Sequence, residues 1–423
     1  MKFNQSDLTQ NIVIPVIFIF LYIEPIAIAG LKFSHLYKLV IIYILTLSIL
    51  LHRSYRIYDR NENQYQLLLF ILYCWAIQPI LFAPAREHIT NSVFIGGQRL
   101  FSVLLFHWSL HKNFSAETLF RFYNYFIIYN MLTALPFIAG LIRPLGSVYD
   151  ISKFGIEAAN AFIGVFQTSH NAALIMTMSG VGAFSLMYTN TNKKSRIYYI
   201  LLTIGFILLT IFTYARAGWI AFIAGLFAVL WEVNKTKSIF REKKTWLFIG
   251  CITIVLFGLT IKYGEALKMR ALGQTKYNIR TATGFDAISS GRLSIWNASK
   301  EIFLDASMLE KIAGIGEEEL TRRMHRQIGL KLFAHNGFIN QLLSNGLIGL
   351  SLLLSLIISL WYQISGVKHK RYRILCIASF VCWLTHFIFQ GGEFPIALSL
   401  LFLVVTISIK SQNSISEKRM MAI

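Results

Sequence analysis

The sequence predicts an all-α integral membrane protein with about twelve transmembrane helices. Of its 423 residues, 55% are hydrophobic and only 14% are charged, and the mean hydropathy is +0.56. This composition excludes an ordinary soluble protein. Leu, Ile and Phe are concentrated in runs that approach the roughly 20 residues an α-helix needs to cross a bilayer, and short basic clusters separate these runs.

The apolar runs define the predicted spans. These are residues 11–29, 36–51, 65–83, 91–110, 119–139, 160–188, 197–215, 217–232, 245–263, 337–362, 372–390 and 394–409. The first run contains Glu24-Pro25 and lacks a small-residue cleavage site, which favours a retained span over a signal peptide.

The positive charge of the chain predicts its topology. The net charge is +20, from 40 Lys and Arg against 20 Asp and Glu. Because this charge lies mainly in alternate connections between the spans, it marks cytoplasmic loops, and no nucleic-acid partner is predicted. Both termini are then cytoplasmic. The expected organisation is 1–263 with the first nine spans, 264–334 as a large periplasmic loop, 335–410 with the last three spans, and 411–423 as a cytoplasmic tail.

The 264–334 loop is longer and more polar than the other connections, and such loops are usually functional. One helix is predicted from apolar residues at helical spacing after Arg292, with Ser290 and Gly291 placed to start it. A second runs from Glu317 to Lys331, with acids first and bases last, an order that suits the helix dipole. We therefore expect two short amphipathic helices at the outer membrane surface.

Three polar residues are candidates for chemistry. Arg216 lies at a tight junction between two apolar spans, either as an arginine that reaches the interface or as a cation for an anionic ligand. His335 precedes a span that Asn336 can cap, and the positive end of that helix favours a neutral imidazole, which can accept a proton. Its alternative is an interfacial residue without chemistry. Arg292 heads the first loop helix, where a surface salt bridge is the alternative.

Metal and disulfide chemistry is not predicted. The four cysteines all fall inside predicted spans: Cys74, Cys251, Cys376 and Cys382. This placement gives neither a disulfide framework nor Cys/His metal spacing. The sequence also has no Asp-x-Asp motif, which argues against a nucleotide-sugar enzyme that depends on a divalent metal. We expect no metal and no cofactor.

Four motifs resemble the bacterial O-antigen ligase and polymerase superfamily. His335-Asn336, followed after nine residues by Gly346-Leu347-Ile348-Gly349, is similar to its His-Asn/Ser/Gln-x9-Gly-x-x-Gly signature. Without this likeness, the two glycines indicate only close approach of a neighbouring helix. Thr213-Tyr214-Ala215-Arg216-Ala217 resembles its Thr-x-(Ser/Thr)-Arg-(Gly/Ala) junction and departs from it at Ala215. The other two motifs resemble the start of its large periplasmic loop and the Gly-x-Gly that follows: Gly291-Arg292-Leu293-Ser294-Ile295-Trp296 and Gly314-Ile315-Gly316.

The resemblance covers roughly residues 210 to 350. It implies a GT-C-like glycosyltransferase of the bacterial inner membrane, multi-pass, with its active site facing the periplasm. The implied donor is a glycan on undecaprenyl diphosphate, the acceptor is lipid A-core or a lipid-linked glycan, and membrane lipids surround the protein. No metal is implied.

The resemblance also assigns roles to residues. Arg216 and Arg292 would be catalytic by binding the diphosphate, which suits a bidentate guanidinium. His335 would be the general base for the acceptor hydroxyl. Asn336 and Arg99 are candidate substrate-binding residues. Other intramembrane polar groups could line the lipid or glycan path or pair with each other, as could Arg99: Glu24, His170-Asn171 and His386.

Two alternatives stay open. The complete histidine signature favours a ligase, which moves finished O-antigen onto lipid A-core, over a polymerase, which extends lipid-linked repeat units. A lipid-linked oligosaccharide flippase is the alternative from another class, because twelve spans and buried cations also suit a transporter. It fits less well, since the notable residues gather at one face beside one large loop. The motifs do not indicate the sugar, the linkage or the oligomeric state.

Overall fold

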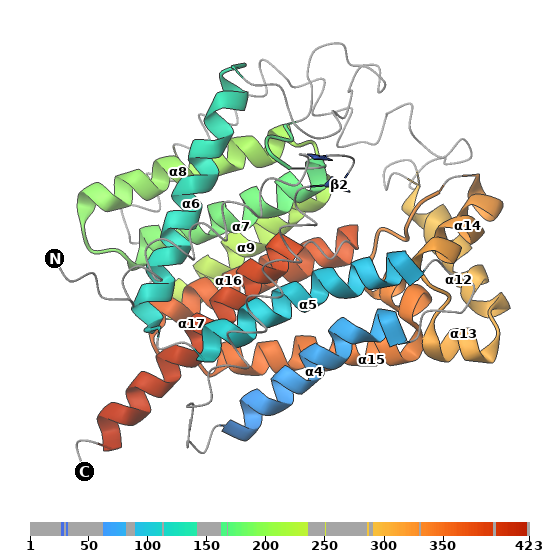
Figure 1. Cartoon of the computed structure of the whole chain (residues 1–423). Helices are drawn as coiled ribbons and strands as arrows, with labels where there is room; N and C mark the ends of the chain where they lie inside the picture. Colours follow the sequence, from blue (N-terminus) through green and yellow to red (C-terminus); the bar gives the residue numbers. More distant parts are fainter. Residues whose placement is uncertain are drawn as a thin grey trace. The chain divides into compact units, whose positions relative to one another are not determined.

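The computed structural model of the chain is built almost entirely from α-helices (Figure 1). It describes residues 27–28, 31–32, 62–81, 89–111, 114–141, 162–166, 168–235, 250, 286, 291–329, 331–391 and 395–420. Strand structure within these ranges is limited to β1 (Ala27–Ile28) and β2 (Leu31–Lys32), which pair antiparallel. The predicted helical class is therefore confirmed for these ranges apart from this pair. The span predicted over 11–29 is wrong at residues 27–28, because these form β1 and not a helix.

The chain folds into two compact units. The first contains the described parts of 121–294 and 370–386. Its helices are most of α6 (Ala116–Ile138), α7 (Ser169–Thr189), α8 (Lys193–Phe212), α9 (Arg216–Asn234) and most of α16 (Lys370–Gln390).

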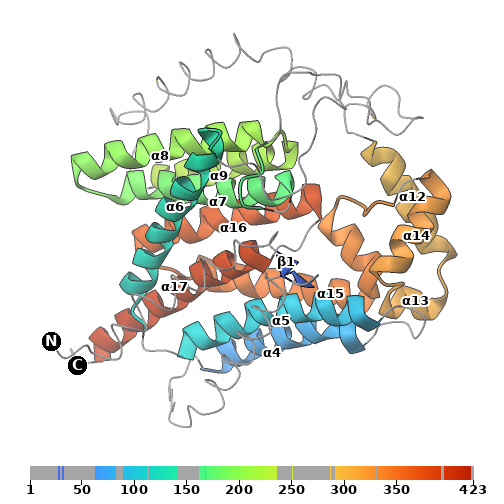
Figure 2. The ribbon, with the colours of Figure 1, turned by 45° about the horizontal axis from the view of Figure 1, so that its top comes forward.

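The centre of the first unit is α7, which packs against both α8 and α9 (Figure 2). Nearly all of its side chains are buried. The contact with α9 is close, because a Cβ added at Gly180 would lie 2.5 Å from the ring of Phe222. A bulkier residue at position 180 would therefore force α7 and α9 apart.

The second unit contains the described parts of 27–120, 295–369 and 387–423. Its long helices are α4 (Glu62–Leu81), α5 (Ile89–His111), α15 (Gly337–Ser365) and α17 (Pro395–Met420). The shorter helices α12 (Arg292–Asp305), α13 (Met308–Ala313) and α14 (Glu317–Ile328) lie together near one end of α15 (Figures 1 and 2). α5 packs against α4 and α17, and α15 packs against the same two helices.

Five described helices are long and apolar enough to cross a membrane: α7, α8, α9, α15 and α16. This identifies a membrane protein. Predicted spans that fall within the described ranges each coincide with a helix, although some bounds differ. The span predicted from 160 begins only at Ser169, because the Thr168 hydroxyl accepts a hydrogen bond from the Asn171 N–H (3.2 Å) and caps the helix there.

Other predicted bounds differ at the end of the chain or remain untested. α17 continues to Met420, so most of the predicted tail 411–423 is helical. The spans predicted over 36–51 and 245–263 lie outside the described residues, except for residue 250. The total of twelve spans therefore stays a prediction.

The 264–334 segment holds three described helices where two were predicted. α12 and α14 match the expected pair, and α13 is additional. It is only six residues long, yet it begins with a capping box in which Ser307 and Glu310 exchange side-chain and backbone hydrogen bonds. The Ser-x-x-Glu spacing is the sequence signal that predicts such a cap.

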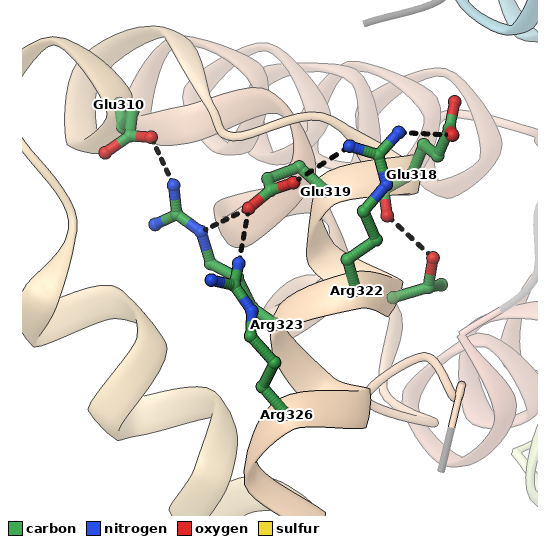
Figure 3. A network of polar contacts seen from close by, with 7 residues as sticks. Glu310, Glu318, Glu319, Arg322, Arg323 and Arg326 are labelled. Carbon is green, nitrogen blue, oxygen red and sulfur yellow. Dashed lines mark hydrogen bonds and ion pairs between the residues drawn. The ribbon is translucent and has the colours of Figure 1, made fainter. Parts of the chain in front are cut away.

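An ion pair joins α14 to α13 as part of a network of charged side chains (Figure 3). Arg323 donates to Glu319 on its own helix (3.1 Å) and to Glu310 on α13 (2.5 Å). Partial burial alone would raise the pKa of Glu310, but hydrogen bonds from Ser307 and Arg323 lower it below its ordinary value. Arg322 and Arg326 extend the network to the acids of the first turn. The predicted order of acids and bases thus produces a charged face on α14.

Candidate active site

Arg216 is the first residue of α9, and the turn before it is tight. Tyr214 adopts a left-handed conformation, with φ of 53°, and Ala215 is the N-cap. The hydroxyl of Thr213 donates to Thr210 O (2.7 Å) and accepts from Ala215 N (3.2 Å). Ala215 has no side-chain oxygen, so it makes no capping hydrogen bond to the first turn. The position where this sequence departs from the family motif is therefore the N-cap of α9.

Arg292 is likewise the first residue of a helix, α12. Asp286 caps the first turn of α12, a contact that the sequence did not predict, and the predicted role of Ser290 lies outside the described residues. Asp286 Oδ1 accepts from Leu293 N (2.8 Å), and Asp286 Oδ2 accepts from the Ser294 hydroxyl (2.5 Å). Gly291, with φ of 75°, lets the chain turn so that an acid several residues upstream reaches the helix end. Sequence patterns look for a cap next to the helix and so missed it.

His386 lies in the same unit as both arginines. It is fully buried near the end of α16, and Arg292 is close enough for an electrostatic interaction with it. His386 was predicted only as one of several polar groups of open role. The structure therefore brings this histidine to one of the two predicted diphosphate-binding residues.

Both arginines occupy positions that favour anions over cations. The dipole at a helix N-terminus disfavours a positive side chain there by about 0.3–1 kcal/mol. The first N–H groups of a helix have no partner within it and can bind an anion. An arginine at the same end adds a charge and a fork of donors toward that anion. At α9 no side chain caps the first N–H groups, so Arg216 can act together with them on an anion. At α12 the carboxylate of Asp286 already accepts from Leu293 N and Ser294 N, so Arg292 contributes only its own charge and donors.

His335 lies in the second unit, directly before α15. Its φ is 49°, an uncommon left-handed conformation for a residue other than glycine. Asn336 caps the helix as predicted, because its side-chain oxygen accepts from Phe338 N (2.9 Å) and Ile339 N (3.1 Å). This use of its oxygen gives Asn336 a structural role beside the substrate-binding role predicted for it.

The turn that carries His335 is fastened through the preceding residue, Ala334. The indole N–H of Trp296, on α12, donates to Ala334 O (3.0 Å). The side chain of Asn340, on α15, accepts from Ala334 N (2.7 Å) and donates to Gly391 O (3.0 Å). Trp296 is one helical turn after Arg292, so α12 carries a predicted cation at its start and a support for the histidine turn just beyond it.

Gln390 faces the imidazole of His335. Its side-chain nitrogen is 3.5 Å from His335 Nδ1. An amide presents either its N–H₂ or its oxygen after a half-turn of its last bond, and this choice sets which ring nitrogen of a neutral histidine carries the proton. Trp296 belongs to the predicted loop motif, but its contact with Ala334 was not predicted, and nothing in the local sequence marks Gln390 or Asn340. Only the fold brings these three side chains to the histidine turn.

Arg99 is buried in the second unit among polar groups of α4 and α15. It donates to Trp75 O (3.1 Å) and to Gln341 Oε1 (3.1 Å). Its guanidinium lies 4.5 Å from the centre of the Trp75 ring, within cation–π range. Asn345 also donates to Gln341 (3.2 Å). The contacts described here tie α5 to α4 and α15, and the predicted binding role of Arg99 stays a prediction.

Of the two glycines after His335, Gly346 differs from the expected helix-packing role. Gly346 interrupts α15, with φ of 67° and ψ of −169°. The contact at this break is with the loop and not with a neighbouring long helix: a Cβ on Gly346 would lie 2.2 Å from Ile312 O. A Cβ on Gly349 would lie 3.4 Å from Gln78 Oε1 of α4, so the expected approach of a neighbouring helix is found at this glycine. Gly346 therefore accommodates the backbone of α13, which the sequence pattern did not reveal.

The Gly-x-Gly motif of the loop fills the break in α15. Ile315 N donates to Leu343 O (2.9 Å) and Gly316 N donates to Ser344 O (3.0 Å), replacing helical hydrogen bonds lost at the break. Gly314 must be glycine, because its φ is 100° and a Cβ would lie 2.2 Å from Ser344 O. The two glycine motifs are thus two sides of one joint.

The predicted site residues divide between the units. The first unit contains Arg216 and Arg292 together with His386, and the second contains His335, Asn336 and Arg99. Among the other polar candidates, the backbone N–H of Asn171, next to His170, donates to the Thr168 hydroxyl that caps α7. Glu24 lies outside the described residues.

Comparison with known proteins supports the motif assignment. Residues 200–354 match the protein family described as O-Antigen ligase, which confirms the predicted family. The matched segment includes all four motifs and implies a glycan-transferring enzyme. No curated protein matches the chain.

Proposed function

We propose, on the basis of the O-antigen ligase match over residues 200–354, that this protein transfers a glycan from undecaprenyl diphosphate to an acceptor hydroxyl, and that the acceptor is lipid A-core. The acceptor oxygen forms a bond to the anomeric carbon of the donor sugar while the bond from that carbon to the diphosphate oxygen breaks. The hydroxyl proton passes to the enzyme, and undecaprenyl diphosphate leaves.

One observation supports these roles best: each predicted catalytic residue stands at the N-terminal end of a helix. Arg216 begins α9, Arg292 begins α12, and His335 directly precedes the cap of α15. Helix N-termini stabilise negative charge, and the charge that develops in this reaction is on the departing diphosphate. We assign Arg216 and Arg292 to the diphosphate and His335 to the acceptor proton.

The assignment of His335 sets a condition on Gln390. For Nε2 to accept the acceptor proton, Nδ1 must carry the ring proton and donate it to an acceptor. The side-chain oxygen of Gln390 supplies that acceptor when the amide is turned toward Nδ1, a position only 3.5 Å from the present amide nitrogen. Gln390 then selects the tautomer, as the carboxylate does in other histidine-based sites.

The orientation follows from the charge asymmetry of the connections. We propose that the protein lies in the bacterial inner membrane with the 264–334 segment in the periplasm. A cysteine at Ser289 should react with an impermeant reagent in intact cells, and a cysteine at Ser238 should not. Labelling of Ser238→Cys in intact cells would overturn this orientation.

The acceptor is tested directly with purified protein. The enzyme is given a glycan on undecaprenyl diphosphate together with either lipid A-core or a second lipid-linked repeat unit. Extension of lipid A-core supports the ligase, and extension of the repeat unit identifies a polymerase instead. Failure with both acceptors, by protein that is folded and binds the donor, would contradict the transferase assignment and favour a transporter.

A further inference from the structure

The helix α13 presents apolar side chains to its surroundings. Met308 is 72% exposed and Leu309 is 74% exposed, and Leu304, at the end of α12, is 59% exposed. The neighbouring helices behave differently, since α12 buries Ile302 and α14 buries Leu320. Contiguous exposed apolar side chains of this kind mark a surface that another phase or partner covers.

Both charged side chains of α13 have partners within the loop. Glu310 pairs with Arg323 on α14, and Lys311 Nζ donates to Leu304 O (2.9 Å) while lying over the ring of Phe303. Both charges on the six-residue helix are therefore bonded within the loop. The exposed part of α13 consists mainly of Met308, Leu309 and Ile312.

The joint at Gly346 fixes the depth of α13. α13 packs against α15, and the residues that follow it bond to the carbonyls of Leu343 and Ser344. α15 is broken at Gly346, and residues 347–365 alone span about 28 Å at 1.5 Å per residue, close to the roughly 30 Å of the hydrocarbon core. Part of α15, at one end, must therefore lie at or beyond the edge of the core.

An aromatic pair indicates which part that is. Trp361 and Tyr362 are exposed near the C-terminal end of α15, where such side chains mark a membrane interface. About 20 residues span the core, so the opposite interface lies near residue 342, close to the break at Gly346. α13 is then at the level of the interface and not in bulk water.

The exposed apolar face of α15 begins near this interface. Leu347, Leu354 and Ile358 are exposed at helical spacing and form its outward stripe. Leu347 directly follows the glycine against which α13 packs. The apolar surface of α13 therefore lies next to the start of this stripe.

We propose that α13 inserts into the nearer leaflet of the membrane, with Met308 and Leu309 among the lipid chains. The occupant of this apolar surface is lipid and not a second protein. The helix thereby anchors the loop at a fixed depth through the joint with α15. This inference does not depend on the transferase assignment or on which side of the membrane the loop lies.

Nitroxide accessibility in lipid nanodiscs tests the proposal. Full-length protein with its four cysteines replaced by serine is labelled at Leu309→Cys, and Arg326→Cys on α14, whose side chain is 68% exposed, is the matched control. The label at 309 should collide with oxygen, which partitions into lipid, at least several-fold more than the control, and should be shielded from the water-soluble Ni-EDDA. Equal exposure of both labels to Ni-EDDA would overturn the proposal, as would shielding of the 309 label from both reagents, which indicates a protein partner.

A second measurement covers the case in which cysteine replacement unfolds the protein. A photoreactive benzoylphenylalanine is placed at Met308 in the otherwise unchanged chain and irradiated in membranes. Adducts of lipid mass support insertion, and a crosslinked dimer or a crosslink to another protein overturns it.

Discussion

The helix starts at Arg216 and at His335 share one backbone plan but differ in how firmly they are held. In each, a left-handed residue precedes the N-cap: Tyr214 at 53° and His335 at 49°. Ala215 makes no side-chain capping bond, whereas Asn336 accepts two hydrogen bonds. The turn at His335 is also bonded through Ala334 on both its N–H and its carbonyl.

The difference fits the two roles. The charge of Arg216 acts on a diphosphate over a longer range than a proton transfer does, although its bidentate hydrogen bonds still require the guanidinium fork. A general base must lie within hydrogen-bonding distance of one proton, in one orientation. The two turns are held differently: side chains distant in sequence bond the histidine turn, whereas the local Thr213 hydroxyl bonds the Arg216 turn. Orientation should therefore matter most at the His335 turn, and charge at the Arg216 turn.

The largest effect is expected for His335→Ala. Loss of a general base should lower the turnover number by about 10²- to 10⁴-fold, while affinity for the lipid-linked donor stays within about twofold. Transfer and donor binding are measured on purified protein. The control is His325→Ala, since His325 is an exposed histidine on α14. Equal losses in both variants would remove the special role of His335.

Arg216→Ala and Arg292→Ala should each slow transfer by roughly ten- to a hundredfold or more, because charge-assisted hydrogen bonds contribute about 1.5–3 kcal/mol. Arg216→Lys keeps the charge but loses the bidentate fork, so it should also be impaired. Surface polysaccharide in a deletion strain is the readout, at matched protein abundance. Arg326→Ala, on the exposed face of α14, should behave like the parent. Full restoration by both alanine variants would contradict the diphosphate assignment.

The comparison of the two turns is tested by Asn340→Ala and Thr213→Val. Asn340→Ala removes hydrogen bonds to Ala334 and Gly391, each contributing about 0.5–1.5 kcal/mol, so turnover should fall about tenfold with donor affinity unchanged. Thr213→Val removes a hydroxyl from the Arg216 turn and should cost less than about threefold. An effect of Thr213→Val as large as that of Asn340→Ala would show that both turns require the same rigidity.

The pH dependence of a Gln390→Glu variant tests whether His335 is the general base. A carboxylate facing Nδ1 favours the charged imidazole and should therefore raise the pKa of His335. Since the neutral form is the base, transfer falls as pH drops through this pKa, and the falling limb of the rate profile should move to higher pH. A profile that does not move in Gln390→Glu, with His335 intact, would separate Gln390 from the base.

The smallest expected effect is a gain. Ala215→Ser supplies the oxygen that α9 lacks at its N-cap and should raise the free energy of unfolding by about 0.5–1 kcal/mol. Thermal unfolding in detergent measures it, with Ala221→Ser on α9 as the control for serine alone, because Ala221 is fully buried away from the cap. An unchanged or lowered stability for Ala215→Ser would show that a serine hydroxyl does not reach the first turn.

Much of the fold could be predicted from the sequence, because apolar periodicity and length determine which segments can cross a bilayer. α15 and α16 occur close to their predicted bounds. The bounds moved where a polar side chain intervened, as at Thr168, which starts α7 later than hydropathy indicates. α13 was not predicted, because a helix of six residues is too short to show a clear apolar periodicity.

The candidate site was predictable only where short motifs carry it. His335, Arg216 and Arg292 each lie in a short motif that resembles the family, and His335 also precedes a helix start that Asn336 marks. Their supports are not local: Trp296 is 38 residues from Ala334, and Gln390 is 55 residues from His335. The role of Gly346 was likewise hidden, because its partner Gly314 lies in the loop and only the folded chain brings them together.

The central claim, that His335 removes the acceptor proton, is tested most directly by His335→Gln. Glutamine keeps a hydrogen-bonding amide but cannot accept a proton near neutral pH, so it preserves orientation and removes base catalysis. Turnover is measured with saturating donor and acceptor as a function of pH. The account predicts a loss of at least about 10²-fold and disappearance of the falling limb at low pH. Near-normal turnover of His335→Gln would contradict the base assignment and leave His335 with positioning alone.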